Sequence, residues 1–378
     1  MNSKRKTILL VGGGTGGHII PILNIRDELK KNPKLKVYTI GGDSSIDKKF
    51  YTGLSNHLTL KTGKMHRSIT FENIFQFFLL LWGMTSAFLI LKRIKPDVIF
   101  SKAGFVSFPV IFWSKILNIP YFIHESDIVM GAANRFAASH ANKIFVGFPV
   151  DNYPYLDKTQ LEFVGQIIRP IVLQNEEKMY DFGFENNKPS ILVTGGSQGA
   201  KNINKAVFQI LEEILNEYNV IHHTGSLDYG RAIEARSKLN NKQKKSYFIS
   251  PLLTVTKNKV DIMKSAIFQS KIVISRASAT TLAEVSTAKK AIIAVPYKFA
   301  ASDHQSKNAD YYKKNRAAVV ISDDHLNGKT LKKEIDKLVT SSKIMKEMGE
   351  NAFNLQVSYG VSKIVEELEF FNRKCEKL

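Results

Sequence analysis

Short apolar runs rich in β-branched residues recur along the whole chain, and helix-like stretches separate them. They lie at residues 7–11, 36–40, 97–100, 121–123 and 144–146 in the first half, and at 191–194, 220–223, 247–249, 272–274, 291–295 and 317–321 in the second. Near-continuous apolar strands that alternate with helices are typical of parallel sheets covered by helices on both faces. The pattern therefore predicts a doubly wound α/β fold.

Each half of the chain contains the same arrangement of a strand followed by a glycine-rich loop. The strand at residues 8–11 runs into GGGTGGH at 12–18, and the strand at 191–194 runs into GGSQGA at 195–200. This repeat predicts two Rossmann-like domains, the first over residues 1–165 and the second over residues 166–355. Residues 356–378 end the chain with a helical pattern of apolar and charged residues. We expect this helix to pack back on the first domain.

Composition narrows the range of partners without identifying one. Lys and Arg together number 54 against 34 for Asp and Glu, which leaves a formal net charge of +20. An excess of this size favours nucleic acid, phosphorylated metabolites or an acidic membrane surface. Neither a zinc-ligand spacing nor an RNA-binding aromatic signature accompanies the charge, so we expect no nucleic-acid partner. The single cysteine, Cys375, excludes an internal disulfide and suits a reducing compartment.

The first glycine loop has the composition of an anion-binding site. Glycine tolerates positive φ and lets another group approach the backbone, and the helix that follows points unpaired N–H groups at that group. Gly12, Gly14 and Gly17 also satisfy the GxGxxG pattern of dinucleotide-binding enzymes. Asp43 follows the second strand as a ribose-binding acid would. A nicotinamide-dependent oxidoreductase is therefore an alternative at this point.

His18 is the first large side chain after this loop, at the start of the predicted helix. The helix dipole disfavours an imidazolium at that position, so we expect a neutral imidazole that accepts a proton near neutral pH. A general base needs this property. The alternative is a histidine that only hydrogen-bonds the backbone.

Motifs in order along nearly the whole chain resemble the MurG family, the membrane-associated N-acetylglucosaminyltransferases of peptidoglycan synthesis. They are GGTGGH at 13–18, KPDVIFSKAGFVSFP at 95–109, IPYFIHESD at 119–127, ANR at 133–135, GGSQGAKNIN at 195–204, ISRASATTLAE at 274–284 and DHQSKNA at 303–309. The resemblance implies a GT-B architecture, with UDP-GlcNAc held mainly by the C-terminal domain. It places the lipid-linked muramyl-pentapeptide acceptor on the N-terminal domain and implies inverting transfer that forms a β-1,4 linkage. The DxD metal motif of many other glycosyltransferases is missing, so no metal or other cofactor is expected.

On this resemblance, the donor is held by groups suited to a nucleotide sugar. Ser197 and the loop amides can cradle the diphosphate, the Glu284 carboxylate can accept both ribose hydroxyls, and the Gln305 amide can donate to one GlcNAc hydroxyl and accept from another. Residues 251–261 read as an insertion in the region whose backbone would contact uracil. The full implied donor set is Thr15, Gly16, Gly17, Arg169, Ser197, Gln198, Ile249, Ala279, Thr280, Thr281, Leu282, Glu284 and Gln305.

The acceptor set implied by the resemblance lies in the first half of the chain. His124, Glu125 and Asp127 end a predicted strand, where doubly wound sheets place their ligands. Glu125 or Asp127 could share or replace the base role of His18, and the sequence does not rank the three. The residues implied to contact the acceptor are Gly14, Phe105, His124 and Asn134.

Residues 71–95 form a long apolar segment, FENIFQFFLLLWGMTSAFLILKRIK, in which residues 73–91 carry no charge. This length approaches the roughly 20 residues that span a bilayer. A spanning helix would, however, separate strands that share one sheet. We expect instead an amphipathic surface helix that dips Phe78, Leu81 and Trp82 into the anionic cytoplasmic leaflet of the inner membrane, with Lys and Arg on either side. Burial of the segment in the core is the alternative.

Overall fold

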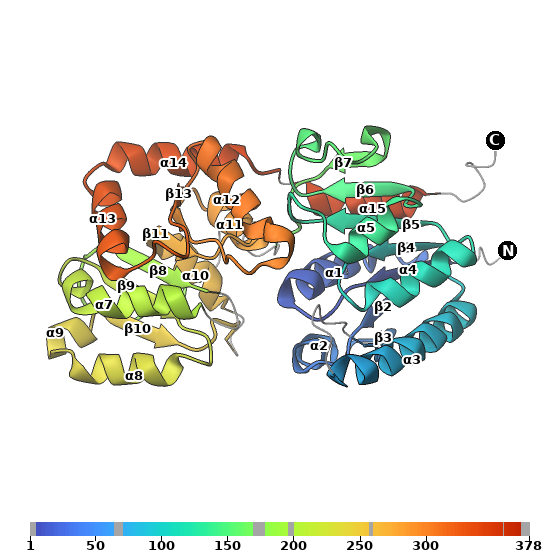
Figure 1. The fold of residues 1–378 in the computed structure, drawn as a ribbon, viewed down its shortest axis with the longest axis horizontal. Helices are drawn as coiled ribbons and strands as arrows, with labels where there is room; N and C mark the ends of the chain where they lie inside the picture. The colour runs from blue at the N-terminus through green and yellow to red at the C-terminus, as the bar shows by residue number, and fades with distance from the viewer. Residues whose placement is uncertain are drawn as a thin grey trace. The chain divides into compact units, whose positions relative to one another are not determined.

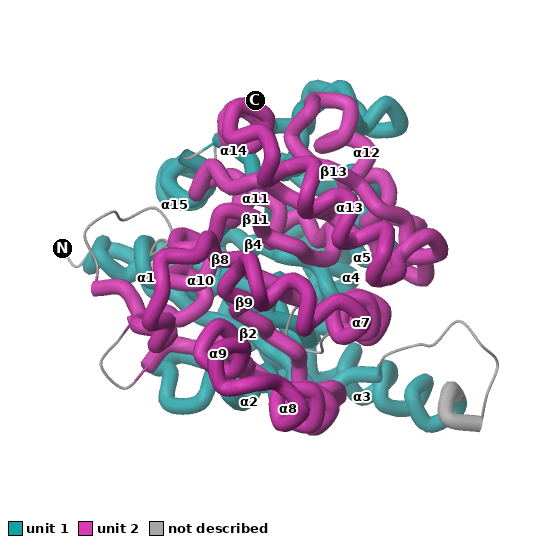
Figure 2. The backbone as a smooth tube through the Cα atoms, turned by 90° about the vertical axis from the view of Figure 1, so that its left-hand side faces the viewer, with its two compact units in different colours: residues 1–169, 357–378 teal, residues 170–356 magenta. Residues whose placement is uncertain are grey.

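The computed structural model describes residues 5–63, 71–168, 178–195, 200–256, 260–357 and 359–371. The chain divides into two compact units, shown in different colours in Figure 2. Unit 1 comprises residues 1–169 and 357–378, and unit 2 comprises residues 170–356. Each unit contains one parallel sheet, so the expected doubly wound α/β fold is confirmed.

Unit 1 is built on a seven-stranded sheet in the order β3-β2-β1-β4-β5-β6-β7, with every pair parallel. The strand order changes direction at β1, where the connection to β2 leads to one side and the later strands lie on the other. Val11 of β1 is opposite Ser101 of β4, so both strands end at the same level. The strands are β1 (Lys6–Val11), β2 (Leu35–Gly41), β3 (His57–Thr59), β4 (Val98–Ser101), β5 (Tyr121–Glu125), β6 (Lys143–Val146) and β7 (Leu161–Phe163).

The last described helix belongs to unit 1, although unit 2 precedes it in the sequence. Helix α15 packs on α1, and Figure 1 shows it, in red, among the blue and green elements of this unit. Its Ile364, Val365 and Leu368 join the core that contains Ile22 and Ile25 of α1. The helices of unit 1 are α1 (Gly16–Leu29), α2 (Ser45–Tyr51), α3 (Phe71–Ile94), α4 (Ser107–Ile116), α5 (Ala132–Ala138) and α15 (Gly360–Phe370), with short 3-10 turns η1 (Val150–Asn152) and η2 (Lys158–Gln160).

Helix α3 lies on the surface of unit 1. Residues Ile74–Ile94 are long and apolar enough to cross a membrane by length and composition. The helix nevertheless connects β3 to β4, and these strands share one sheet, so it cannot span a bilayer while the sheet is intact. It packs on α4, where the Trp113 indole donates to the Met84 carbonyl at 2.7 Å.

The outer face of α3 is apolar, which differs from the expected amphipathic pattern. Gly83, Ala87 and Leu91 are buried. Most of the large side chains on the opposite face are apolar and exposed, and both faces are therefore non-polar. Burial of the segment in the core, the alternative interpretation, is wrong. The exposed apolar set is Ile74, Phe75, Phe77, Phe78, Leu81, Trp82 and Leu89, with Phe78 at 63% and Trp82 at 65% exposure.

Unit 2 repeats this arrangement with a six-stranded parallel sheet in the order β10-β9-β8-β11-β12-β13. Its first five strands follow the same order as β3-β2-β1-β4-β5 of unit 1, as the two glycine loops suggested. The strands are β8 (Ser190–Thr194), β9 (Asn219–His223), β10 (Tyr247–Ser250), β11 (Ser270–Ser275), β12 (Ala291–Ala294) and β13 (Val319–Val320). The helices are α7 (Lys201–Glu217), α8 (Tyr229–Lys238), α9 (Asn241–Lys244), α10 (Ile262–Gln269), α11 (Ala279–Thr287), α12 (His304–Lys314), α13 (Gly328–Val339) and α14 (Ser342–Asn354), with the 3-10 turn η3 (Ala301–Asp303).

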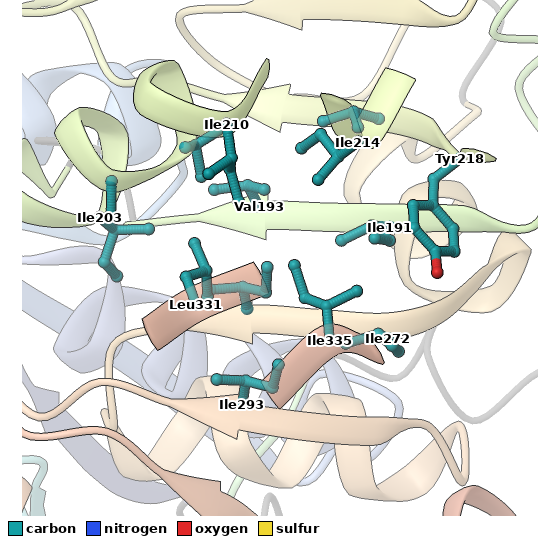
Figure 3. Packing of buried hydrophobic residues seen from close by; sticks show 14 of the residues in the cluster. Ile191, Val193, Ile203, Ile210, Ile214, Tyr218, Ile272, Ile293, Leu331 and Ile335 are labelled. Atoms are coloured by element: carbon teal, nitrogen blue, oxygen red, sulfur yellow. The ribbon is translucent and has the colours of Figure 1, made fainter. Parts of the chain in front are cut away.

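The core of unit 2 lies between its sheet and the helices α7 and α13, as Figure 3 shows. Ile203, Ile210 and Ile214 of α7 recur at helical spacing and are buried. They pack in one cluster with Ile191 of β8 and Ile335 of α13. Packing of the apolar face of α7 against this core holds the helix in place on the sheet. The N-terminus of α7, which directly follows the second glycine loop, is held with it.

Candidate active site

The glycine loop after β1 is shaped by side chains that pack against it. Gly14 has φ +88°, and a Cβ atom there would lie 2.5 Å from Cε1 of Phe105. A Cβ atom at Gly13 would lie 2.5 Å from Oδ1 of Asp47. Both positions therefore require glycine. The structure thus brings together Gly14 and Phe105, two of the residues that the resemblance assigns to the acceptor.

A carboxylate of the chain itself accepts hydrogen bonds from one backbone amide of this loop, that of Gly14, and from an amide that follows β2. Asp47 is fully buried on α2, and its oxygens accept hydrogen bonds from the amides of Gly14 at 3.1 Å and Gly42 at 2.8 Å. A dinucleotide pyrophosphate at these amides would meet this buried negative charge, so the loop does not fit the oxidoreductase alternative. Sequence reasoning missed Asp47. The available signal was Ser44, which caps α2 by accepting a hydrogen bond from the Asp47 amide at 3.2 Å.

His18 lies in the first turn of α1 with one ring nitrogen already bonded. Its Nδ1 lies 3.2 Å from the carbonyl oxygen of Gly13. A carbonyl only accepts, so Nδ1 carries the proton and the lone pair of the neutral ring is on Nε2. Burial and the nearby Lys102 ammonium lower the pKa of His18 to about 4. Burial and Lys102 thus favour the neutral imidazole that the sequence analysis expects at this position.

The other residues at the start of α1 differ in exposure. Thr15, the N-cap residue, and Gly17 are exposed, and Gly16 is half-buried. The resemblance assigns all three to the donor, and they lie on the unit 1 side of the chain. They directly precede His18 in the same loop, so a ligand bound by their backbone would lie close to the imidazole.

The end of β5 is held by buried polar side chains. His124 is fully buried, and its Nε2 lies 3.0 Å from the carbonyl oxygen of Gly165. Burial and Lys102 lower the pKa of His124 well below the usual range, so it is neutral. Asn134 of α5 is also buried and donates to the carbonyl of His124 and to Oε2 of Glu125, both at 3.0 Å. Both residues therefore position the loop that follows β5.

Glu125 is surrounded by donors from its own loop. The side chain is 4% exposed, and it accepts hydrogen bonds from the amides of Asp127 and Gly131 and from Asn134, each at 3.0 Å. Burial and the neighbouring Asp127 carboxylate raise the pKa of Glu125. Asp127 is half-buried. Nε2 of His18 has no hydrogen bond to any described residue, whereas both carboxylate oxygens of Glu125 accept from their own loop or from Asn134.

In unit 2, the motif ISRASATTLAE forms the end of β11 and the start of α11. Ser278 is the N-cap of α11 and accepts a hydrogen bond from the Thr281 amide at 3.3 Å. Thr280 and Thr281 are half-buried, whereas Ala279 and Leu282 are buried and pack inward. Glu284 lies in the second turn of the same helix and is 9% exposed.

Gln305 and Arg276 connect the neighbouring loops of unit 2. Oε1 of Gln305 accepts a hydrogen bond from the Tyr297 amide at 2.9 Å, which leaves its NH₂ group to donate to a ligand. Arg276, which sequence reasoning left out, pairs with Asp323 at 2.7 Å and lies over the Tyr297 ring at 5.3 Å. The Gln305 side chain keeps both donor hydrogens and one lone pair of Oε1, so the expectation that it donates to and accepts from GlcNAc hydroxyls stays a prediction.

The remaining residues and segments expected to bind the donor lie against the core of unit 2, in the expected insertion or outside the described residues. Ile249 of β10 packs against the hydrophobic core of unit 2. Within the expected insertion at residues 251–261, the Thr256 amide donates to the Val260 carbonyl at 2.8 Å. These two residues, on either side of residues 257–259, therefore lie together. Arg169, Ser197 and Gln198 lie outside the described residues.

Two family models match this chain. The glycosyltransferase family 28 N-terminal domain matches residues 8–146, and the C-terminal domain of the same family matches residues 190–365. Two similar curated proteins are N-acetylmuramyl-(pentapeptide) pyrophosphoryl-undecaprenol N-acetylglucosamine transferases. The protein from Bacillus cereus is 32% identical over 88% of this chain and 91% of its own length. The protein from Clostridium perfringens is 34% identical over 89% and 90%.

Solved structures share the two-unit fold. The crystal structure of Acinetobacter baumannii MurG has a TM-score of 0.73 at 21% identity, covering 97% of this chain and 100% of that one. Staphylococcus aureus MnaA with UDP has a TM-score of 0.68 at 12% identity, covering 97% and 96%. The expected GT-B fold is therefore confirmed. With matches along both units, the chain belongs to glycosyltransferase family 28 and, within it, to the MurG family.

Proposed function

We propose that this protein transfers N-acetylglucosamine from UDP-GlcNAc to undecaprenyl-diphosphate-muramyl-pentapeptide, with inversion, to form the β-1,4 linkage of the peptidoglycan precursor. The similarity to curated transferases of this activity over nearly the whole chain supports the substrates. The observation that carries the chemistry is His18, a neutral imidazole whose Nε2 is available at the edge of the glycine loop.

The transfer needs a base and a stabilised leaving group. The acceptor hydroxyl oxygen attacks C1 of the sugar as His18 Nε2 takes the hydroxyl proton. The bond between C1 and the phosphate oxygen breaks, and UDP leaves with the electron pair. Glu125 organises the loop after β5 through its three hydrogen bonds, and with His124, Asn134, Gly14 and Phe105 it shapes the acceptor side. Asp127 remains the second candidate for the base.

Unit 2 supplies most of the donor contacts in this proposal, and Thr15, Gly16, Gly17 and Arg169 of unit 1 supply the rest. Glu284 binds the ribose hydroxyls, and the Gln305 NH₂ group donates to a GlcNAc hydroxyl. The N-terminus of α11, with Thr280 and Thr281, faces the anionic part of the donor. Arg169, Ser197 and Gln198 complete the diphosphate and nucleotide contacts on the strength of their motifs alone.

Unit 1 also binds the membrane through α3. Its exposed apolar face would insert at the headgroup boundary, and the exposed Lys92, Arg93 and Lys95 at its C-terminal end would meet anionic lipids. This arrangement suits a peripheral protein on the cytoplasmic face of the inner membrane. The lipid-linked acceptor would then reach the same unit that holds His18.

Replacement of His18 should affect turnover more than donor affinity. In His18→Gln, an amide of similar size cannot act as a base, so kcat should fall about 10²-fold to 10⁴-fold. Steady-state kinetics and UDP titration on the same preparation measure both effects. Near-normal kcat in a folded variant would move the base to Asp127.

Replacement of Glu284 should weaken nucleotide binding. A hydrogen bond to a charged group is worth about 1.5–3 kcal/mol, so the Kd of UDP should rise roughly 10-fold to 100-fold in Glu284→Ala. Calorimetric titration with UDP measures this change, and Glu284→Gln is the size-matched control that keeps one carbonyl acceptor. An unchanged Kd in Glu284→Ala would contradict the ribose assignment.

Nucleotides should stabilise the protein selectively. UDP or UDP-GlcNAc at about 100 times its Kd adds about 2.7 kcal/mol to the stability of the folded state, which raises Tm by about 5–10 °C. NADH at the same concentration should leave Tm unchanged, because the Gly14 amide of the glycine loop already donates to the buried Asp47 carboxylate. Thermal unfolding with each ligand separates the two enzyme classes, and stabilisation by NADH alone would reverse the assignment.

The apolar face of α3 should be needed for membrane binding but not for folding. In the Leu81→Ser and Trp82→Ser double variant, both side chains are already exposed, so Tm should hold. Binding to vesicles that contain phosphatidylglycerol should fall, together with activity on membrane-embedded acceptor. Transfer to a short soluble acceptor analogue should continue.

Two controls complete the membrane experiment. Leu227→Ser removes an exposed leucine from unit 2 and should not change vesicle binding. Vesicles of phosphatidylcholine alone, or added salt, should weaken binding of the unaltered protein, because anionic headgroups attract the flanking cations. Normal vesicle binding by the α3 variant would rule out this surface.

A further inference from the structure

Lys102 lies near His18 because the strands that precede them, β4 and β1, are neighbours in the sheet. Lys102 follows the last residue of β4, and its amide donates to the carbonyl of Val11 at the end of β1 at 2.8 Å. A Cβ atom at Gly12 would lie 2.8 Å from the His18 carbonyl oxygen and 3.4 Å from Cβ of Lys102. Two residues after Lys102, a Cβ atom at Gly104 would lie 3.0 Å from Nδ1 of His18. The chain segments that carry the lysine and the imidazole are therefore in close contact.

The ammonium group of Lys102 is buried and anchored. The side chain is 2% exposed, and Nζ donates to Oγ of Ser126 at 2.6 Å. Ser126 is itself held, since its carbonyl accepts from Nε2 of Gln166, also at 2.6 Å. Ser126 Oγ is the one hydrogen-bond acceptor of the Lys102 side chain among the described residues. Burying the charged ammonium of Lys102 costs free energy, because the group loses its hydration. This cost suggests that the charge serves the reaction as well as the packing.

Charged and titratable groups from several elements face this position. Burial lowers the pKa of Lys102 to about 8, while the Glu125 and Asp127 carboxylates act to raise it, so the lysine is charged at pH 7. Its charge acts in turn on both nearby histidines and lowers their pKa values. The facing groups are His18 of α1, Asp47 of α2, His124 and Glu125 of β5, and Asp127 of the following loop.

We propose that Lys102 is a positioning residue of the transfer reaction, whose buried ammonium, anchored on Ser126, extends the neutral, proton-accepting form of His18 to lower pH. The proposal rests on the proposed role of His18 as base. An imidazolium next to the ammonium is disfavoured, so His18 stays available at mildly acidic pH and releases the proton it has taken once the product leaves. Lys102 does not need to touch the substrate to act in this way.

The direct test is the titration of His18 in variants of Lys102. Lys102→Met removes the charge and keeps the length, and Lys102→Arg keeps the charge. Removing a cation at this range should raise the pKa of His18 by about one unit in the Met variant, while the Arg variant should stay near the unaltered protein. Long-range ¹H–¹⁵N NMR follows the imidazole, and the missing signal in His18→Gln assigns it. An unchanged His18 titration in Lys102→Met would overturn the proposal.

Kinetics supply a second readout that a purely structural role would not change. The acid limb of kcat/KM should move to higher pH by the same amount in Lys102→Met and stay in place in Lys102→Arg. A variant that lowers kcat/KM equally at every pH, with a lower Tm, would indicate packing alone and contradict the proposal. Normal turnover in His18→Gln would instead refute the base assignment while the NMR result for Lys102 still stood, so the two failures are distinguishable.

Discussion

Parallel pairing between β1 and β4 is the constraint on which the site of unit 1 depends. Because Val11 lies opposite Ser101, both strands end at one level, and the loop that carries His18 leaves the sheet next to Lys102. The strand order also changes direction at β1, which is where doubly wound sheets leave room for a ligand. Phe105 reaches Gly14 for the same reason. Motifs far apart in the sequence thus converge through the register of one strand pair.

Burial at this edge then decides which groups carry charge. His18 and His124 are held neutral, the pKa of Glu125 is raised, and Lys102 retains its proton with Glu125 and Asp127 nearby. Asp47 accepts from the Gly14 amide of the glycine loop and from the Gly42 amide after β2, from inside the protein. The loop is therefore not an empty anion site like a dinucleotide-binding turn. Its glycines admit the chain's own side chains and leave the imidazole at the edge.

The same sheet explains the position of α3. A helix with the length and composition of a membrane span is kept on the surface because β3 before it and β4 after it belong to one sheet. The side with Gly83 and Ala87 is buried, with Thr62 packed against Gly83, and the bulky apolar side chains remain outside. The small residues of α3 thus decide which face is buried. Unit 1 consequently combines the proposed base and the proposed membrane surface in one compact body.

The sequence by itself was enough to predict the alternating strands and helices, the two similar units and the family. Continuous apolar strands between helices predicted parallel sheets, the repeated glycine loop predicted two similar units, and the ordered motifs predicted the family. Only the tertiary structure decided what each polar group does. Asp47, Lys102 and Arg276 were missed, and Glu125 proved to be bonded within its own loop, because these roles follow from which strand ends are neighbours and how deeply they are buried. The spacing of apolar residues along the chain predicts whether a segment forms a helix or a strand. It does not predict which distant residues the sheet will place side by side.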